Sequence, residues 1–296
     1  MSERIIETFP VLIKVVVFAG MTVVGTDCTL TGLRDILRRP SLWVAVTLGQ
    51  FFLVPVVMYA CCYQLGVSIE VTASLILIAC CPTGSISNTY CYFARGNSSL
   101  SVSLTALSTL VALVATPTTL SVARGILGSE DSGLPLIPIL PLLQELGLMM
   151  IVPFVIGVTL RARKPEWILD HQRTLRRVAL ILLIALLGLI FGSRPSEIAQ
   201  YLQEISLVTA LFTISLLSLG WLVGRAFRLS STDWPAVLFE FPCRNLSIAA
   251  VIGITVLNRP ELVRFAAALF LIQAVMLLPL TWAIVKQRAD VRRETK

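Results

Sequence analysis

Two short polar segments lie within long apolar runs of this chain and hold the residue types that could bind a solute. They are residues 82–89, Pro-Thr-Gly-Ser-Ile-Ser-Asn-Thr, and residues 240–245, Glu-Phe-Pro-Cys-Arg-Asn. Proline and glycine often only kink a membrane helix, but non-helical backbone at membrane depth must be enclosed by protein or line a wet cavity. Paired broken helices in the two halves of a chain are typical of transporter sites. We therefore expect a binding site where the segments meet.

The second segment contains two charges, Glu240 and Arg244. A charge at the centre of a bilayer costs about 2.5–3.5 kcal/mol on insertion scales, so both residues need a partner. Their i, i+4 spacing allows an ion pair within one helix. Alternatively, Glu240 binds a cation or a proton, and Arg244 offers its planar donors to a carboxylate or sulfate. On this interpretation Arg244 and Asn245 bind the substrate together with Thr83 and Ser85 of the first segment.

Hydroxyl and amide side chains surround the first segment. In the apolar run that follows, Ser101, Thr105 and Ser108 recur at spacings of four and three, which places them on one helix face. Oxygen ligands in this number suit a hard cation such as Na⁺. The alternative is that these groups bond to their own helix or to a neighbouring helix. The full set is Ser85, Ser87, Asn88, Thr89, Ser101, Thr105, Ser108 and Thr109.

Three more polar residues interrupt apolar runs. Gln50 precedes Pro55 in the middle of its run, where it could bind an ion or join a neighbouring helix. Lys14 is near the outer end of its run, which predicts that its ammonium group reaches to the membrane surface. Glu145 is either a second carboxylate in a relay or a group in a wet cavity, and the sequence leaves both open.

The elements that position these residues are membrane helices. The chain has 296 residues, 56% hydrophobic and 14% charged, with a mean hydropathy of +0.86. The apolar runs lack the alternation of a barrel strand, so the predicted fold class is an all-α polytopic membrane protein. Nine spans are predicted, at residues 8–26, 42–63, 69–94, 98–122, 135–160, 175–192, 205–224, 234–257 and 262–285.

Basic residues are unequally divided between the two sets of connecting segments. Seventeen fall on one side, six of them in a predicted loop over residues 161–177, and five on the other. The excess predicts an external N-terminus and a cytoplasmic C-terminus in a cell (plasma or inner) membrane. Because the basic residues form no stripe on a soluble face, the net charge of +7 does not indicate a nucleic-acid partner. The sequence leaves the oligomeric state open.

The sequence also argues against an enzyme. It has no HExxH or GxSxG pattern, and its one histidine, His171, falls in the predicted loop. The seven cysteines form no CxxC pair and are expected to be small buried thiols. Cys243, beside Glu240, keeps an arsenite-type exporter open as an alternative, and a channel or sensor on the same fold is another.

The residues around the first segment resemble the bile acid:sodium symporter family. The resemblance rests on Cys-Cys-Pro-Thr-Gly-Ser-Ile-Ser-Asn at 80–88, Tyr-Phe-Ala-Arg-Gly-Asn at 92–97 and Leu-Ser-Thr-Leu at 107–110, and it covers almost the entire chain. It implies inverted repeats, a panel domain and a core domain in which two discontinuous helices cross. The first family helix is missing here, which leaves nine. The implied division is 1–41 and 127–200 for the panel, and 42–126 and 201–296 for the two core halves.

The resemblance also implies two sodium sites. The first would use Ser87, Asn88, Ser101, Thr105 and Glu240, all of which carry oxygen ligands. The second would use Gln50, Glu240, backbone carbonyls near Phe241 and Cys243, and a glutamine at the position of Arg244.

Arg244 is the main departure from the family pattern. Its positive charge would repel a nearby Na⁺, so we expect one sodium site, with the guanidinium in place of the second ion. The predicted function is a secondary transporter of a small organic anion, either bile-acid-like or a compact carboxylate or sulfate ester. It would work by alternating access coupled to one Na⁺. A carrier that is coupled to H⁺ through Glu240, or is uncoupled, is the alternative.

Overall fold

The computed structural model describes residues 3–127, 133–193 and 195–294, and every named element in these ranges is a helix. The predicted all-α fold class is confirmed. The elements are α1 Glu3–Asp27, α2 Leu30–Leu37, α3 Pro40–Leu48, η1 Gly49–Leu53, α4 Val54–Gln64, α5 Ile69–Cys80, α6 Ile86–Phe93, α7 Ser98–Leu127, α8 Ile139–Leu146, η2 Gly147–Ile151, α9 Val152–Arg163, α10 Pro165–Ser193, α11 Pro195–Ala226, α12 Trp234–Glu240, α13 Leu246–Val251, η3 Ile252–Val256, η4 Pro260–Val263 and α14 Ala266–Glu294.

Six continuous helical segments among the described residues are long and apolar enough to cross a membrane. Two other predicted spans are interrupted: α5 is followed by α6, and α12 by α13 and η3. The sixth predicted span falls within α10. The total of nine crossings stays a prediction. The six segments are Pro10–Asp27, Pro40–Gln64, Ser98–Leu127, Ile139–Arg163, Ala199–Ala226 and Pro260–Arg288.

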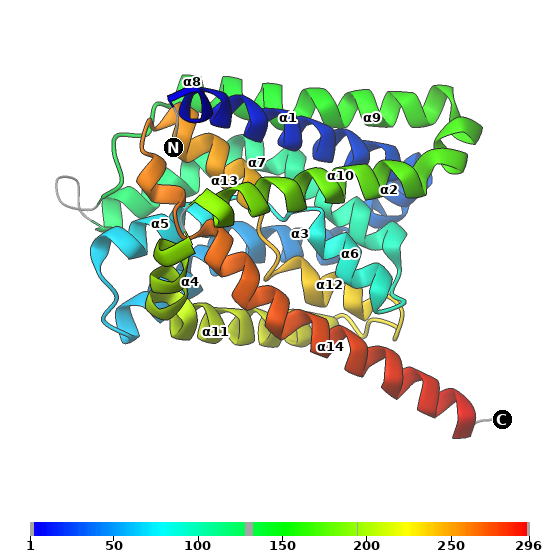
Figure 1. Ribbon diagram of the computed structural model, residues 1–296. Coiled ribbons are helices and arrows are strands. Elements are labelled where there is room, and N and C mark those ends of the chain that lie inside the picture. Colours follow the sequence, from blue (N-terminus) through cyan, green and yellow to red (C-terminus); the bar gives the residue numbers. More distant parts are fainter. Residues whose placement is uncertain (1–2, 128–132, 194, 295–296) are drawn as a thin grey trace.

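The interrupted helices lie between two outer groups of helices (Figure 1). Along one side, α1 packs on both α9 and α10. Along the opposite side, α11 packs on α14 and on the half-helix α12. This arrangement encloses the breaks in protein, as exposed backbone polar groups inside a membrane require.

Two helical segments differ from the sequence prediction. Residues 161–177 were expected to form a loop, but α9 continues to Arg163 and α10 begins at Pro165. The first break is also shorter than predicted, because α6 begins at Ile86 and includes Ser87, Asn88 and Thr89. Small polar residues are compatible with a helix when a hydroxyl bonds to the backbone, and Ser87 Oγ donates to the Gly84 carbonyl at 3.0 Å.

Helices α1 and α9 approach each other closely through two glycines. A Cβ atom on Gly157 would lie 2.2 Å from the Thr22 carbonyl oxygen, and one on Gly25 would lie 2.2 Å from the Phe154 carbonyl oxygen. The atoms that would be struck belong to the backbone, so no side chain can move aside. Small residues at such crossings let membrane helices pack closely.

We expect Gly157→Ala to lower the free energy of unfolding by about 1–3 kcal/mol, because the added methyl group overpacks the crossing. The melting midpoint of the purified protein in detergent would measure the loss. Gly20→Ala on α1 is the matched control, because a Cβ there meets nothing within 4 Å. Equal melting midpoints for the two variants would show that the crossing accommodates the added methyl group without a loss of stability.

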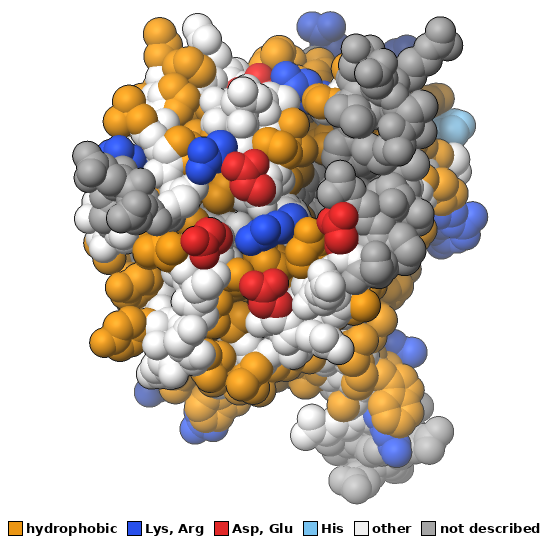
Figure 2. All heavy atoms as spheres, turned by 60° about the vertical axis from the view of Figure 1, so that its left-hand side comes forward, with side chains coloured by type: hydrophobic (Ala, Val, Ile, Leu, Met, Phe, Trp, Pro, Cys, Tyr) orange, Lys and Arg blue, Asp and Glu red, His pale blue; other side chains and the backbone are white. Residues whose placement is uncertain are grey.

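The end of the molecule where α5 and α8 begin carries both signs of charge. Figure 2, in which that end is turned forward, shows acidic and basic side chains interspersed. Lys14 Nζ lies 2.8 Å from Glu145 Oε1, and Arg259 Nε lies 2.5 Å from Glu261 Oε1. Lys14 was expected only to reach the surface, but instead it pairs with the carboxylate whose role the sequence left open. The pair joins α1 to α8.

Candidate functional site

The two broken helices are joined backbone to backbone where they cross. Gly84 N donates to the Cys243 carbonyl at 2.9 Å, and Asn245 N donates to the Pro82 carbonyl at 2.8 Å. Thr83 and Arg244 thereby form an isolated antiparallel bridge. Gly84 suits this approach, since a Cβ on it would lie 3.2 Å from the Arg244 carbonyl oxygen. The bridge fixes the two polar segments against each other.

Side chains satisfy the carbonyls that the broken helices leave open. A helix end has carbonyls without helical partners, and lipid offers none. Thr116 Oγ1 donates to the Cys80 carbonyl at 3.1 Å, and Gln273 Nε2 donates to the Pro242 carbonyl at 3.0 Å. Thr83 Oγ1 donates to the Glu240 carbonyl at 2.8 Å. The hydroxyl of Thr83, predicted to bind substrate, is therefore held within the crossing.

The five predicted cation ligands form one connected cluster on α6, α7 and α12. Asn88 Oδ1 accepts from Ser101 Oγ at 2.8 Å and from Thr105 Oγ1 at 3.2 Å. The Glu240 carboxylate lies 3.2 Å from Thr105 Oγ1 and 3.3 Å from Ser87 Oγ. Each of these hydroxyls has one proton, which Thr105 divides between Glu240 and Asn88 Oδ1, and Ser87 between Glu240 and the Gly84 carbonyl. Glu240, Ser87, Ser101 and Thr105 are buried. The cluster offers hydroxyl, amide and carboxylate oxygens, the ligand types of a hard cation.

Gln50 reaches the same cluster from the π-helical turn η1. Ser108 Oγ donates to Gln50 Oε1 at 2.6 Å, and Gln50 Nε2 lies 3.4 Å from Glu240 Oε1. A π-helical turn widens the helix locally and often marks a functional position. Here the Gln50 carbonyl also accepts from Arg244 Nη2 at 3.4 Å. Gln50 thus connects the carboxylate to the guanidinium.

Arg244 is buried without a carboxylate partner. The i, i+4 geometry needed for a pair does not exist, because α12 ends at Glu240, and no Glu240–Arg244 ion pair occurs within 4.0 Å in this described region. The guanidinium donates through Nη2 to the Cys81 and Gln50 carbonyls. Its Nε and Nη1 have no hydrogen-bond partner among the described residues. An ion pair with Glu240 therefore does not account for Arg244.

A cavity of about 640 Å³ lies between α1 and α10 on one side and α6, α7 and α13 on the other. Its walls are mostly apolar, with Val16, Met21 and Val24 of α1 facing Ile86 and Phe93 of α6. Of the predicted site residues it reaches Ser85, Asn88 and Asn245, whereas Thr83 and Arg244 do not line it.

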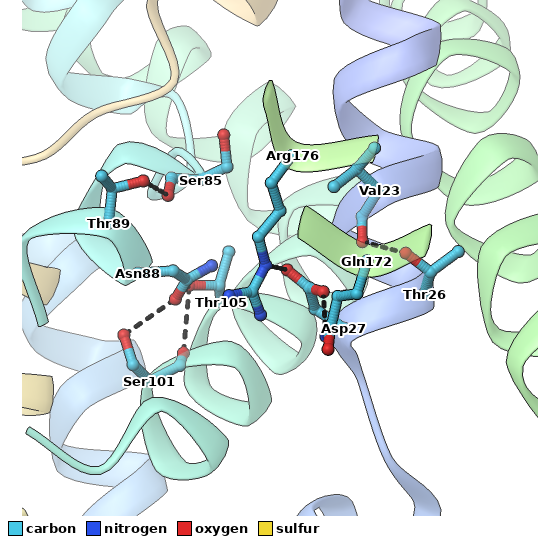
Figure 3. A network of polar contacts seen from close by, with 10 residues as sticks. All are labelled: Val23, Thr26, Asp27, Ser85, Asn88, Thr89, Ser101, Thr105, Gln172 and Arg176. Carbon is cyan, nitrogen blue, oxygen red and sulfur yellow. Dashed lines mark hydrogen bonds and ion pairs between the residues drawn. The ribbon is translucent and has the colours of Figure 1, made fainter. Parts of the chain in front are cut away.

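Three arginines of α10 also line this cavity, and the sequence interpretation missed their position. Arg176 Nε reaches Asp27 Oδ2 of α1 at 2.8 Å, and Gln172 Nε2 donates to Asp27 Oδ1 at 2.7 Å (Figure 3). Arg173 and Arg177 line the cavity beside them. The signal was their i, i+3, i+4 spacing, which places all three on one helix face, but assigning residues 161–177 to a loop concealed it.

The burial of the thiols agrees with the sequence prediction. All seven cysteines are buried, including Cys243 in the crossing. The only histidine, His171, lies exposed on α10 and stacks on Trp167.

Comparison with known proteins gives the chain its family. Residues 14–220 match the Sodium Bile acid symporter family. This chain belongs to that family. The match includes the first broken helix and ends before Glu240, so the second half of the site rests on the geometry above.

Several relatives are similar to this chain over much of its length. It is 24% identical to the uncharacterized sodium-dependent transporter YocS of Bacillus subtilis over 81% of this chain and 73% of that protein. It is 27% identical to a probable chloroplastic sodium/metabolite cotransporter of Arabidopsis thaliana, over 79% of this chain and 58% of that one. It is 31% identical to the human ileal sodium/bile acid cotransporter, over 60% and 50%. This chain therefore spans about half the length of these plant and human relatives.

The family and the helices together make this a multi-pass membrane protein of a transporter family. A family of symporters fits the sequence argument against an enzyme.

Proposed function

We propose that this protein is a secondary carrier that moves a small organic anion across the membrane by alternating access, coupled to one Na⁺. The observation that carries the proposal is the buried oxygen cluster joining Glu240, Asn88 and Thr105 across three helices. A buried carboxylate without a cation is costly, and a bound Na⁺ would neutralise it. The printed names of the relatives, which describe sodium-dependent transport, support the same assignment.

Ser87, Asn88, Ser101, Thr105 and Glu240 are the proposed ligands of this single Na⁺. Their hydroxyl, amide and carboxylate oxygens are already in mutual hydrogen-bond contact, so they need little rearrangement to surround an ion. Na⁺ would be a transported co-substrate in this scheme.

Arg244 is proposed to act as a built-in cation in place of a second Na⁺. Its guanidinium lies between the carbonyls of Cys81 and Gln50, oxygen atoms that could otherwise face a bound cation. At the end of α5 it also complements the negative end of a helix dipole. Because Arg244 does not line the cavity, we assign it this role in preference to direct contact with the substrate.

The substrate is proposed to occupy the cavity beside the crossing. The half-helices α6 and α13 both begin there, and their N-cap residues, Ser85 and Asn245, line it. Helix N-termini offer free backbone N–H donors to a polar group of the substrate, and apolar walls suit a hydrocarbon body. Asp27, at the end of α1, lines the cavity on the side that is cytoplasmic in the predicted orientation. Movement of the core helices against a panel of α1, α9 and α10 would expose the site to the other side.

Uptake into proteoliposomes tests the proposal, with radiolabelled cholate as the first probe because a relative is described as a bile acid cotransporter. We expect saturable uptake that an inward Na⁺ gradient drives and that choline cannot replace, and we expect unlabelled cholate inside to accelerate it by counterflow. Linear uptake without counterflow would indicate a channel. Uptake driven equally by a proton gradient in choline would indicate H⁺ coupling. Arsenite transport that Cys243→Ser abolishes would indicate an exporter.

A further inference from the structure

The end of the cavity that is lined by Asp27 and by the exposed Arg173 and Arg177, here called its mouth, carries an excess of positive charge. Neither the family match nor the proposed cation site uses this charge. Arg173, Arg176 and Arg177 line the cavity from α10, and Asp27 of α1 is the only acidic residue among the described residues of the lining. Asp27 is engaged by Arg176 at 2.8 Å. Within the described part of the chain, Arg173 and Arg177 form no ion pair, and both are exposed.

We propose that Arg173 and Arg177 form an anion-recognition site that holds the charged end of the substrate, while Arg176, neutralised by Asp27, orders the mouth. This rests on the proposed function and deepens it by naming the residues that would hold the charged group of the substrate. Two guanidinium groups one helical turn apart present several donors to one carboxylate, sulfate or sulfonate.

The wall between the two ends of the cavity defines the rest of the substrate. Met21 of α1, whose Sδ lies 3.9 Å from Asn245 Nδ2, is at the crossing, and Asp27 is at the mouth. Asp27 follows Met21 by six positions, or about 9 Å along the helix. The lining side chains of α1 between them are Val23 and Val24, with Val102 of α7 and Leu180 of α10 also in the lining. An anion of matching length would have an apolar body, a polar end at Ser85 and Asn245, and one anionic group at the mouth.

The position of the pair on α10 distinguishes it from a topology signal. Arg163 and Lys164 are exposed at the same end of the molecule and do not line the cavity, whereas Arg173 and Arg177 share a helix face with Leu180 inside it. A topology signal requires positive charge on the cytoplasmic segment, but it does not require that the charged residues share one helix face.

Calorimetric titration of the full-length protein in neutral detergent and NaCl tests the pair with two probes, cholate and its uncharged methyl ester. We expect the unaltered protein to bind cholate about tenfold or more tightly than the ester, the scale of a charge-assisted hydrogen bond. Arg173→Gln/Arg177→Gln should lose this preference while its affinity for the ester stays the same. Arg173→Lys/Arg177→Lys should keep most of it, which also guards against loss of folding.

The matched control is Arg163→Gln/Lys164→Gln, which removes two positive charges at the same end but outside the cavity. It should keep the preference for cholate, and an equal loss would overturn the proposal because only a long-range field would be at work. If Arg173→Gln/Arg177→Gln still binds cholate more tightly than the ester, the proposal is also overturned. If Arg173→Gln/Arg177→Gln lowers only the affinity for phosphatidylglycerol, the two arginines bind lipid headgroups and the proposal fails. If the unaltered protein binds neither probe in Na⁺, the substrate assigned to this cavity is wrong and the proposal fails, whereas Na⁺-driven uptake of another organic anion would leave the proposed function standing.

Discussion

Glu240→Gln should abolish Na⁺-driven transport, reducing the initial rate to the level of empty liposomes. The carboxylate is the one formal negative charge in the proposed cation site, and it is fully buried. Removing one partner of a buried charge pair costs roughly 3–5 kcal/mol, which is a loss of more than about a hundredfold in Na⁺ affinity. Glutamine keeps the shape and one oxygen of the side chain, so the loss would come from the charge.

Two measurements separate this effect from damage to the fold. The Na⁺-dependent rise of the melting midpoint should disappear in Glu240→Gln, because a ligand stabilises only the state that binds it. Glu70→Gln, the same chemical change at an exposed residue of α5, should leave both the midpoint shift and uptake intact. An unchanged Na⁺ concentration for half-maximal uptake in Glu240→Gln would exclude this carboxylate as a ligand.

Arg244→Gln should change the stoichiometry of transport from one Na⁺ per substrate to two. A fixed positive charge about 4 Å from a second Na⁺ would repel it by about 4 kcal/mol at an effective dielectric constant of 20, which is about a thousandfold in affinity. Glutamine removes that charge and supplies an amide oxygen. The Hill coefficient for Na⁺ should rise from about one to nearly two, and each substrate should carry one more positive charge into the liposome.

Arg244→Lys is the control for Arg244→Gln, because it keeps the charge and should keep the stoichiometry at one. The glutamine variant should also lose some thermal stability, because the contact with the Cys81 carbonyl disappears. Two Na⁺ per substrate in the unaltered protein would contradict the role of Arg244 as a replacement cation. One Na⁺ in both variants would show that something other than this charge excludes the second ion.

Local chemistry explains how much of the fold was predictable. The apolar runs require helices because lipid offers no partner to the backbone, and the structure confirms the all-α fold. The two breaks were predictable because a proline follows α5 by two residues and another follows α12 by two. The first break was predicted too long, since Ser87 and Asn88 belong to α6. These two side chains are polar because they face the site, and their polarity does not end the helix.

The identity of the cation cluster was also available from the sequence, through the resemblance of residues 80–88 and the hydroxyl spacing of 101, 105 and 108. The structure brings these side chains together with Glu240, although their role as Na⁺ ligands stays a proposal. The division into panel and core stays a prediction as well.

Pairing between distant helices was decided only by the tertiary structure. Spacing along the chain allowed Glu240 and Arg244 to form an ion pair, and the crossing prevents it by ending α12 between them. The same packing placed Lys14 beside Glu145 and turned three supposed loop arginines toward a cavity. The sequence shows which residues are too polar to face lipid and where a helix must end. The partner of each polar group depends on how helices far apart in the chain rotate and pack, and local spacing does not determine that.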